Sequence, residues 1–459
     1  MKKILYIFTL LTLGVFLSYG QANPQIKPLP KKTRLLFVLD GSGSMQAKWE
    51  NKTRMSIAKR ALTHIVDSLK VNKNVELGLR VYGHQFDRKY KNCQDSKLEV
   101  AFAPDNHHKI THRLKSINPQ GVTPISISLK KAAGDFPTDP NYRNVIIIIT
   151  DGIESCGGDP CAVSKALQKK HIFLQPFIIG IGMSHKEIKQ FDCMGTFYNA
   201  NSVKQFASIL GNIVQHSLQS VQVRVDLLDI KNKATETNVN VSFVNSLTGQ
   251  TEYDFIHYIK DGKSETVEID PVITYDIIVS TTPQVIKKNV RFPKKGLNIV
   301  KIKTPQGVLQ VSQARNQQYK QILGIIRLAG KKNIIHHFIL GEKVSLLVGK
   351  YDVEIMTIPR TYKRVTITQS TTSKIQIAQP GLINIPDTFV GYGSIYKINK
   401  NGEDEWVMNL PKKSIFMSSA MQPGNYKVVV RSSRAIGIEY TISKKFTIKS
   451  GISTRVKLL

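Results

Sequence analysis

The sequence is poor in acidic residues, in cysteine and in tryptophan. Its 459 residues include 33 Asp and Glu against 65 Lys and Arg, which gives a formal net charge of +32. Such an excess suits a nucleic-acid binder, or a protein that faces an anionic surface or polymer. The four cysteines are too few for a disulfide scaffold. Because 41% of the residues are hydrophobic, a wholly disordered chain is excluded.

Signatures of common enzyme classes are also missing. The sequence has no HExxH and no GxSxG motif, and no Lys-Ser or Lys-Thr pair completes a phosphate loop after Gly41. We therefore expect a protein that is not an enzyme. The positive charge is spread as short doublets, +13 over residues 23–220 and +17 over residues 221–459. This spread argues against a nucleic-acid-binding arm and leaves a solvated basic surface or attraction to an anionic envelope polymer.

A long apolar segment is missing everywhere except at the start of the chain. There, Lys2 and Lys3 precede an apolar run from Ile4 to Leu17, and Gly20-Gln21-Ala22 supplies a small-residue cleavage site. This pattern predicts a signal peptide over residues 1–22, with an N-terminal anchor as the alternative. We expect an exported protein, periplasmic, cell-surface or secreted, with no transmembrane segment in the mature chain.

Between residues 31 and 220, strand-like apolar runs alternate with helical patterns. This alternation predicts a mostly parallel, Rossmann-like α/β sheet with helices on both faces, which binds ligands at the carboxyl ends of its strands. The predicted strands are Leu35–Leu39, Val75–Tyr82, Leu98–Phe102, Val145–Thr150, Ile172–Ile181 and Thr196–Asn199. The predicted helices are Ser56–Leu69, Lys109–Ile117, Ile125–Phe136, Ala162–Lys170 and Val203–Leu218.

After Val221 the helical periodicity disappears, and short β-branched segments are separated by Gly, Pro, Asn and Ser. A weak repeat is visible: Tyr275-Asp276-Ile277 recurs as Tyr351-Asp352-Val353 and Tyr426-Lys427-Val428, at intervals of 76 and 75 residues. We therefore predict three all-β modules, each of the size of a small antiparallel sandwich. They are module 1 (residues 221–304), module 2 (residues 305–379) and module 3 (residues 380–459).

Oxygen-bearing side chains gather at the predicted carboxyl edge of the sheet. The first strand runs into a DGSGS segment that carries Asp40, Ser42 and Ser44, Thr123 stands just before a helix, and Asp151 ends a buried strand. Because the carboxyl ends of parallel strands meet at one edge, we expect these three hydroxyls and two carboxylates together. A ligand set of hard oxygens favours Mg²⁺, and then Mn²⁺ or Ca²⁺.

With these three segments in order, residues 31–220 resemble a von Willebrand factor A (vWA) domain with a complete metal-ion-dependent adhesion site. The D-x-S-x-S motif of the family corresponds to Asp40, Ser42 and Ser44. The motif threonine corresponds to Thr123 and the strand-four aspartate to Asp151, with no departure at any of these positions. Segments at 82–84 and 151–161 are similar to those of bacterial secreted members.

The resemblance implies a non-catalytic way of binding. In the family, the serine and threonine hydroxyls bind a divalent metal and the aspartates often act through water. One coordination position stays open for a Glu or Asp carboxylate of a partner protein. The alternative is a site that is occupied but purely structural. Val203–Leu218 resembles the closing helix that shifts with ligand in some members; we expect it to stay fixed against the sheet.

All four cysteines lie within residues 31–220, and an even number in an exported protein favours disulfides. Cys156 and Cys161 flank a Gly-Gly-Asp-Pro turn that can bring them together, so we predict this pair. Cys93 and Cys193 are then left to pair with each other. A zinc site is the alternative, but Cys-x4-Cys is not a usual zinc spacing.

These observations predict an exported adhesion or protein-interaction protein. Its head, residues 31–220, is expected to bind a protein ligand with an exposed Asp or Glu through the metal, while the three modules act as a stalk or second surface. The alternative is a structural or carbohydrate-binding protein of the cell envelope, in which the modules bind the polymer.

Overall fold

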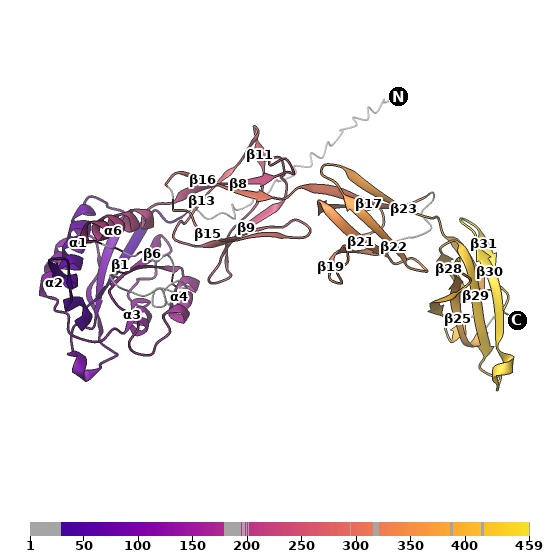
Figure 1. Cartoon of the computed structure of the whole chain (residues 1–459), viewed down its shortest axis with the longest axis horizontal. Coiled ribbons are helices and arrows are strands. Elements are labelled where there is room, and N and C mark those ends of the chain that lie inside the picture. Colours follow the sequence, from indigo (N-terminus) through magenta and orange to yellow (C-terminus); the bar gives the residue numbers. More distant parts are fainter. Residues whose placement is uncertain are drawn as a thin grey trace, which may run out of the picture.

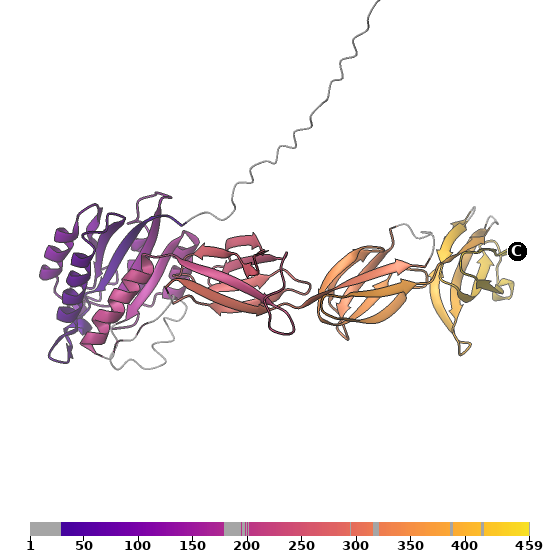
Figure 2. The ribbon, with the colours of Figure 1, turned by 90° about the horizontal axis from the view of Figure 1, so that it is seen from above.

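The computed structural model describes residues 29–178, 194, 198, 200, 202–293, 295–314, 321–385, 389–414 and 417–458. The head and the three modules follow one another along the long axis of the molecule (Figures 1 and 2). The predicted signal peptide, most of the predicted strand Thr196–Asn199 and the end of that predicted at Ile172–Ile181 lie outside the described residues. Within those ranges, no helix is long and apolar enough to cross a bilayer.

The head is built on a five-stranded mixed sheet in the order β5-β4-β1-β6-β7. The strands are β1 (Lys32–Asp40), β4 (Val75–Tyr82), β5 (Ser96–Ala103), β6 (Tyr142–Thr150) and β7 (Ile172–Ile178). β1 pairs in parallel with β4 and β6, and β6 with β7, whereas β5 is antiparallel to β4. The expected parallel sheet therefore has one antiparallel edge strand, and its central strands end side by side.

Five helices of the described head cover the two faces of this sheet (Figure 1). They are α1 (Arg54–Ser68), α2 (His107–Ser116), α3 (Ile125–Ala132), α4 (Pro160–Lys169) and α6 (Val203–Ser217). Leu35, Phe37 and Leu39 of β1 pack with α1, α2 and α6, while Leu36 and Val38 pack with α3 and α4. Successive side chains of a strand point to opposite faces, which is why the unbroken apolar run LLFVL needs cover on both sides.

The modules repeat one strand arrangement three times. Module 1 contains β8 (Val221–Leu228), β9 (Asn240–Asn245), β10 (Thr251–Ile256), β11 (Ile259–Lys260), β12 (Lys263–Ser264), β13 (Thr266–Ile269), β14 (Tyr275–Val279), β15 (Val285–Val290) and β16 (Leu297–Lys303). Module 2 contains β17 (Gln306–Gln313), β18 (Leu323–Leu328), β19 (Ile334–Ile339), β20 (Lys343–Leu347), β21 (Gly349–Ile355), β22 (Thr361–Ile367) and β23 (Thr372–Ile377). Module 3 contains β24 (Gly381–Ile385), β25 (Phe389–Ile398), β26 (Asp404–Asn409), β27 (Lys413–Ser414), β28 (Met417–Met421), β29 (Gly424–Ser432), β30 (Ile442–Ile448) and β31 (Ser453–Arg455).

The three strand sets have equivalent topology. The three-stranded sheets have the orders β13-β8-β16, β20-β17-β23 and β28-β24-β31. The larger sheets have the orders β10-β9-β14-β15, β19-β18-β21-β22 and β26-β25-β29-β30. In every set the first strand pairs in parallel with the last, as β8 does with β16, β17 with β23 and β24 with β31.

The repeated tyrosine lies at the same place in each strand set. Tyr275, Tyr351 and Tyr426 are at most 1% exposed. Their hydroxyls donate to main-chain carbonyls four or five residues earlier, those of Asp270, Leu347 and Gln422. Because a buried hydroxyl needs a hydrogen-bond partner, each tyrosine ties its strand to the preceding turn. The sequence repeat therefore reflects a recurring contact.

A buried ion pair joins the head to module 1. Arg143, near the start of β6, pairs with Asp270 directly after β13, and it also donates to the carbonyl of Ser217 at the end of α6. The side chains of Arg143 and Asp270 are 4% and 1% exposed. Arg143 and Asp151 stand at opposite ends of β6, about 26 Å apart by strand rise. Module 1 therefore attaches to the edge of the sheet opposite the predicted metal ligands.

Candidate metal centre

The turn after β1 forms the first part of the candidate site. The carboxylate of Asp40 accepts hydrogen bonds from the Ser42 N–H at 2.7 Å and from the Thr150 hydroxyl at 2.6 Å. The hydroxyl oxygens of Ser42 and Ser44 are 2.9 Å apart. Gly41 is required here because a Cβ at this position would lie 2.7 Å from the carbonyl oxygen of Tyr82. The tight turn thus brings its polar side chains together.

Two further loops meet this turn. The Gly43 N–H donates to the carbonyl of Gly121 at 2.9 Å, which places the segment leading to Thr123 against the turn. A Cβ added to Gly152 would lie 3.9 Å from Ser44 Oγ and 4.0 Å from Thr123 Oγ1. Both hydroxyls therefore lie beside the loop that follows β6, which carries Asp151.

Asp151 is bonded through both carboxylate oxygens. The Ser44 hydroxyl donates to Oδ1 and the Arg54 guanidinium to Oδ2, each at 2.7 Å. Arg54 begins α1, and its side chain is 20% exposed, whereas that of Asp151 is fully buried. This charge-assisted bond fixes the carboxylate and leaves Oδ1 on the side of the hydroxyls.

Asp40 and Asp151 share a buried space, and their charges repel. Burial and the negative charge of Asp151 raise the pKa of Asp40 to about 6, although hydrogen bonds from Ser42 and Thr150 act in the other direction. Burial, together with the charge of Asp40, also raises the pKa of the neighbouring Tyr82 hydroxyl. A bound cation would relieve this excess of negative charge.

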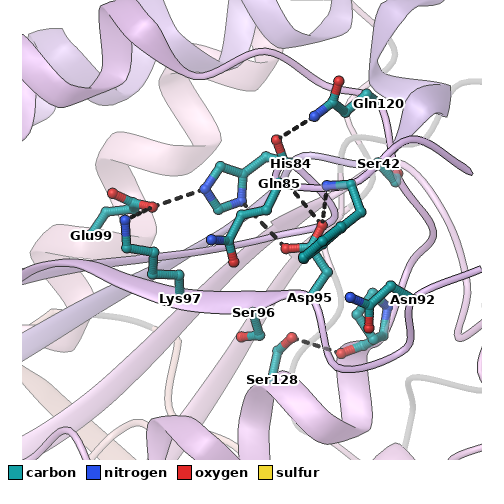
Figure 3. A network of polar contacts seen from close by, with 12 residues as sticks. Ser42, His84, Gln85, Asn92, Asp95, Ser96, Lys97, Glu99, Gln120 and Ser128 are labelled. Atoms are coloured by element: carbon teal, nitrogen blue, oxygen red, sulfur yellow. Dashed lines mark hydrogen bonds and ion pairs between the residues drawn. The ribbon is translucent and has the colours of Figure 1, made fainter. Parts of the chain in front are cut away.

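A polar network supports the loop after β4 (Figure 3). His84 Nε2 lies 2.9 Å from Glu99 Oε1, and the other oxygen of Glu99 accepts from Arg113. Burial alone would raise the pKa of Glu99, but hydrogen bonds from Arg113 and His84 bring it below its usual value. The Gln120 amide donates to the His84 carbonyl at 2.9 Å. The network thus also holds the chain that leads to Thr123.

Asp95 fixes the same loop from the inside (Figure 3). It is 1% exposed and accepts hydrogen bonds from the N–H groups of Gln85 and Phe86 at 2.9 and 3.2 Å. Gly83 precedes them with φ 65°, and a Cβ there would lie 2.3 Å from the Val122 carbonyl oxygen. Only glycine combines this backbone conformation with so close an approach.

The disulfide pairing differs from the prediction. Cys93 is bonded to Cys156, so the predicted pairs Cys156–Cys161 and Cys93–Cys193 are both wrong. Asp159 caps α4 and accepts from the N–H of Cys161, which therefore lies on the first helical turn, away from the expected tight turn. The loop with Cys93 follows β4, which is parallel to β6, so both loops reach the same edge of the sheet. Cys161 is also disulfide-bonded; Cys193 lies outside the described residues.

An open pocket of about 380 Å³ lies over the site. Its lining consists of the hydroxyl-bearing Ser42, Ser44, Thr123 and Ser155, together with Gly121, Val122, Cys93, Arg88 and Lys91. Asp40 and Asp151 are not part of this lining. The pocket therefore presents hydroxyls and positive charge to a ligand, with the two carboxylates behind them.

The donors fit a hard divalent cation. They comprise three hydroxyls and two carboxylates, and the raised pKa of Asp40 reflects negative charge that no nearby cation fully balances. Across the described ranges, no group of three or more His, Cys, Asp or Glu side chains is placed to hold a metal ion. A metal in the head would therefore depend on the hydroxyl oxygens, which suits Mg²⁺.

Several residues that shape the site escaped the sequence reasoning. Arg54 begins a helix and carries no motif signal, and His84 and Asp95 act through contacts between distant segments. Glu154 accepts from the N–H groups of Ser126 and Cys156 and so supports the start of α3. Its place three residues after Asp151 was visible, but nothing in the spacing assigns it this contact.

The head is similar to known proteins over most of its length. A family model described as the von Willebrand factor type A domain matches residues 35–154. The chain is 31% identical over 218 residues to the uncharacterized protein YwmD of Bacillus subtilis (strain 168), which covers 45% of this chain and 94% of YwmD. It is 30% identical over 155 residues to the uncharacterized protein YwmC of the same organism, covering 33% of this chain and 66% of YwmC.

Solved structures show more distant likenesses. The conserved hypothetical protein BatB from Bacteroides thetaiotaomicron is 19% identical with a TM-score of 0.33, covering 40% of this chain and 97% of that one. The pilus adhesin SpaC from Lactobacillus rhamnosus GG is 9% identical with a TM-score of 0.35, covering 92% of this chain and 82% of that one. With TM-scores below 0.5, neither likeness supports a conclusion about the present chain.

Proposed function

Because the chain belongs to the von Willebrand factor type A (vWA) domain family, we propose that its head binds a partner protein through a divalent metal ion, without catalysis. The observation that carries the proposal is the meeting of five oxygen-bearing side chains beneath an open pocket, namely Asp40, Ser42, Ser44, Thr123 and Asp151. We propose that they form a complete metal-ion-dependent adhesion site of the kind found in bacterial secreted members. Mg²⁺ suits these donors best, followed by Mn²⁺ or Ca²⁺.

The residues divide the work between holding the ion and balancing its charge. When bound, the ion supplies a positive charge with a coordination position that a carboxylate can fill. Ser42, Ser44 and Thr123 hold it through hydroxyl oxygens. Asp40 and Asp151 offset its two charges, and Arg54 adds a further positive charge next to Asp151. An anionic side chain of the partner, Asp or Glu, is therefore attracted to the pocket.

The test begins with the ion itself. Mg²⁺ or Mn²⁺ should raise the thermal unfolding temperature of the full chain and of Asp67→Ala, a surface carboxylate of α1 that pairs with Lys70. It should not raise that of Asp151→Ala. Capture of a partner protein from envelope extract should then be lost with EDTA and with Asp151→Ala. Capture that survives both treatments would contradict the proposal.

We propose that residues 221–304, 305–379 and 380–459 are three small β-sandwich modules that carry the head as a stalk. Their equivalent strand orders support this division. Each region also has a hydrophobic cluster of its own, which includes Tyr275, Tyr351 or Tyr426. A separate core is what allows a segment of this length to act as a unit.

A second candidate function is binding of an anionic envelope polymer by the modules. The strand pairs β15–β16, β22–β23 and β30–β31 carry ten basic residues and no acidic one. Equivalent lysines face equivalent residues of the neighbouring strand, with Lys287 opposite Ile277, Lys363 opposite Val353 and Lys444 opposite Val428. Lysines on edge strands also prevent edge-to-edge pairing, which is their competing structural role.

The two functions predict different dependence on metal. Binding of the full chain to isolated cell-wall polymer should survive EDTA if the modules are responsible. It should fall in a triple variant with Lys287→Glu, Lys363→Glu and Lys444→Glu. Polymer binding that is unchanged in this variant would remove the second candidate.

We also propose that the chain is exported to the periplasm, the cell surface or the medium. The Cys93–Cys156 disulfide supports this location, since such bonds persist in oxidising compartments. The spread-out basic charge of an exported protein does not suit a nucleic-acid partner, and we propose none.

A further inference from the structure

We infer that the pocket over the candidate metal centre takes a second anionic group of the ligand, so that the head prefers a protein segment with two acidic side chains. The inference rests on the proposed metal-dependent function and deepens it. It assigns a role in ligand choice to Arg88 and Lys91, which lie outside the metal-ligating motif.

Arg88 and Lys91 line the same pocket as Ser42, Ser44 and Thr123. Arg88 begins the short 3-10 helix η2 (Arg88–Tyr90), and Lys91 directly follows it. Residues three apart in such a helix lie on one side, so the two cations are presented together. Both are exposed, and neither forms an ion pair with any described residue.

The acidic residues of this loop are engaged elsewhere. Asp87 accepts from the Lys89 N–H at 2.9 Å and caps η2. Asp95 is buried and accepts from two backbone N–H groups of the loop. No acidic residue lines the pocket. The charges of Arg88 and Lys91 are therefore available to a ligand that already places one carboxylate at the metal.

The loop that carries the two cations is held at several points. The Arg88 N–H donates to the Gln120 carbonyl at 2.9 Å, and Lys131 donates to the Gln94 carbonyl at 2.8 Å. The Cys93–Cys156 bond ties the loop to the one after β6. A ligand therefore meets a backbone that is already ordered, and loop ordering costs little of the binding free energy.

The size of the effect follows from the exposure of the cations. Exposed charge pairs change an equilibrium constant only modestly, so we expect a diacidic segment to bind about fivefold tighter than a monoacidic one. The preference should shrink when the ionic strength rises, because salt screens exposed charges. The metal-dependent part of binding, which uses more buried groups, should respond less.

The experiment uses the full chain with Mg²⁺ and two synthetic peptides of equal length, one with a single Glu and one with Glu and Asp two residues apart. Binding is measured by calorimetry or fluorescence anisotropy. The double variant Arg88→Ala, Lys91→Ala should bind the monoacidic peptide and Mg²⁺ like the unaltered chain but lose the preference for the diacidic peptide. The control Lys89→Ala changes a cation of the same loop that does not line the pocket and should keep the preference.

Each result bears on a different part of the argument. Equal binding of both peptides by the unaltered chain, or a preference retained in the double variant, overturns this inference and leaves the metal-dependent function standing. Absence of any Mg²⁺-dependent binding that Asp151→Ala abolishes overturns both. A uronic acid oligomer that binds more tightly than the diacidic peptide, through Arg88 and Lys91, assigns the pocket to carbohydrate and overturns the choice of a protein segment.

Discussion

At the scale of single residues, Asp40 is a buried carboxylate whose charge is costly in the metal-free head. Its pKa is raised from 3.8 to about 6 by burial and by Asp151, a shift worth about 3 kcal/mol. Asp40→Asn keeps the shape and removes the charge, and the Thr150 hydroxyl can accept from the new amide. We expect this variant to be more stable by about 1–3 kcal/mol at pH 8 with EDTA, measured by urea unfolding.

The same variant should lose its response to metal. The unfolding temperature of Asp40→Asn should not rise with Mg²⁺, whereas that of the unaltered chain should. The surface change Asp67→Asn serves as the control and should alter neither property. A variant that is destabilised in EDTA and still responds to Mg²⁺ would show that the charge of Asp40 has neither effect.

The raised pKa of Asp40 also sets a pH dependence. A carboxyl whose pKa is higher in the folded state takes up its proton on folding, so it adds stability to the metal-free head as pH falls from about 7 to about 4. In the same window the proton competes with the metal. We expect Mg²⁺ affinity to fall up to tenfold per pH unit below pH 6, measured by titration at pH 5.5 and 7.5. Affinity that is constant over this range would contradict the assignment.

The identities of the candidate ligands could be predicted from the sequence, but their partners could not. Asp40, Ser42 and Ser44 are local in the chain, so their spacing alone places them on one turn. Arg54 reaches Asp151 across 97 residues, and no short-range pattern encodes that contact. The disulfide prediction failed for the same reason, since a nearby cysteine was preferred to one that only the sheet brings close.

At the scale of elements, the Cys93–Cys156 bond joins the two loops that flank the pocket. It closes a loop of 63 residues, for which chain entropy predicts a stabilisation of about 4 kcal/mol. The double variant Cys93→Ser, Cys156→Ser should therefore unfold at lower urea concentration and bind the diacidic peptide less tightly. Non-reducing peptide mapping should recover Cys93 and Cys156 in one linked fragment, and its absence would contradict the pairing.

The last helix of the head is held from three sides, so we expect it to stay fixed. Phe206, Leu210 and Val214 of α6 are buried in the head core. His216 contacts the Phe292 carbonyl of module 1 at 3.0 Å, and Ser217 accepts from Arg143. Hydrogen exchange over residues 203–217 should not change when Mg²⁺ and an acidic peptide are added. Faster or slower exchange there would show that the helix moves with ligand.

Element types were easier to predict than their pairing. The helices of the head have strong 3.6-residue periodicity, and four of the predicted strands coincide with β1, β4, β5 and β6. β5 reads like its neighbours, and nothing in its residues reveals that it runs antiparallel to β4. In the modules the turn residues mark the strands, but register is decided by contacts between segments far apart in sequence.

At the scale of the whole molecule, the Arg143–Asp270 pair sets the attachment of the head. Removing one partner of a buried pair leaves the other charge uncompensated and costs about 3–5 kcal/mol. Arg143→Ala should loosen the junction, with faster proteolysis around residues 218–221 and a broader distance distribution in small-angle scattering. The control Arg364→Ala breaks an exposed pair within module 2, where the arginine is 64% exposed, and should change neither.

The sequence predicted the number of parts but not how the head is joined to module 1. The tyrosine repeat revealed three equivalent units because the same hydrogen bond recurs in each. Arg143 and Asp270 carry no motif and lie 127 residues apart. Their pairing exists only once both folds are formed.

The parallel pairing of first and last strands has a mechanical consequence. The chain enters a module at one end of this ladder and leaves at the other, so tension along the molecule would load all of its hydrogen bonds in shear instead of opening them one at a time. The ladder has seven residue pairs between β8 and β16, six between β17 and β23, and three between β24 and β31. Under a pulling force the module farthest from the head should yield first, lengthening the molecule while the head keeps its grip.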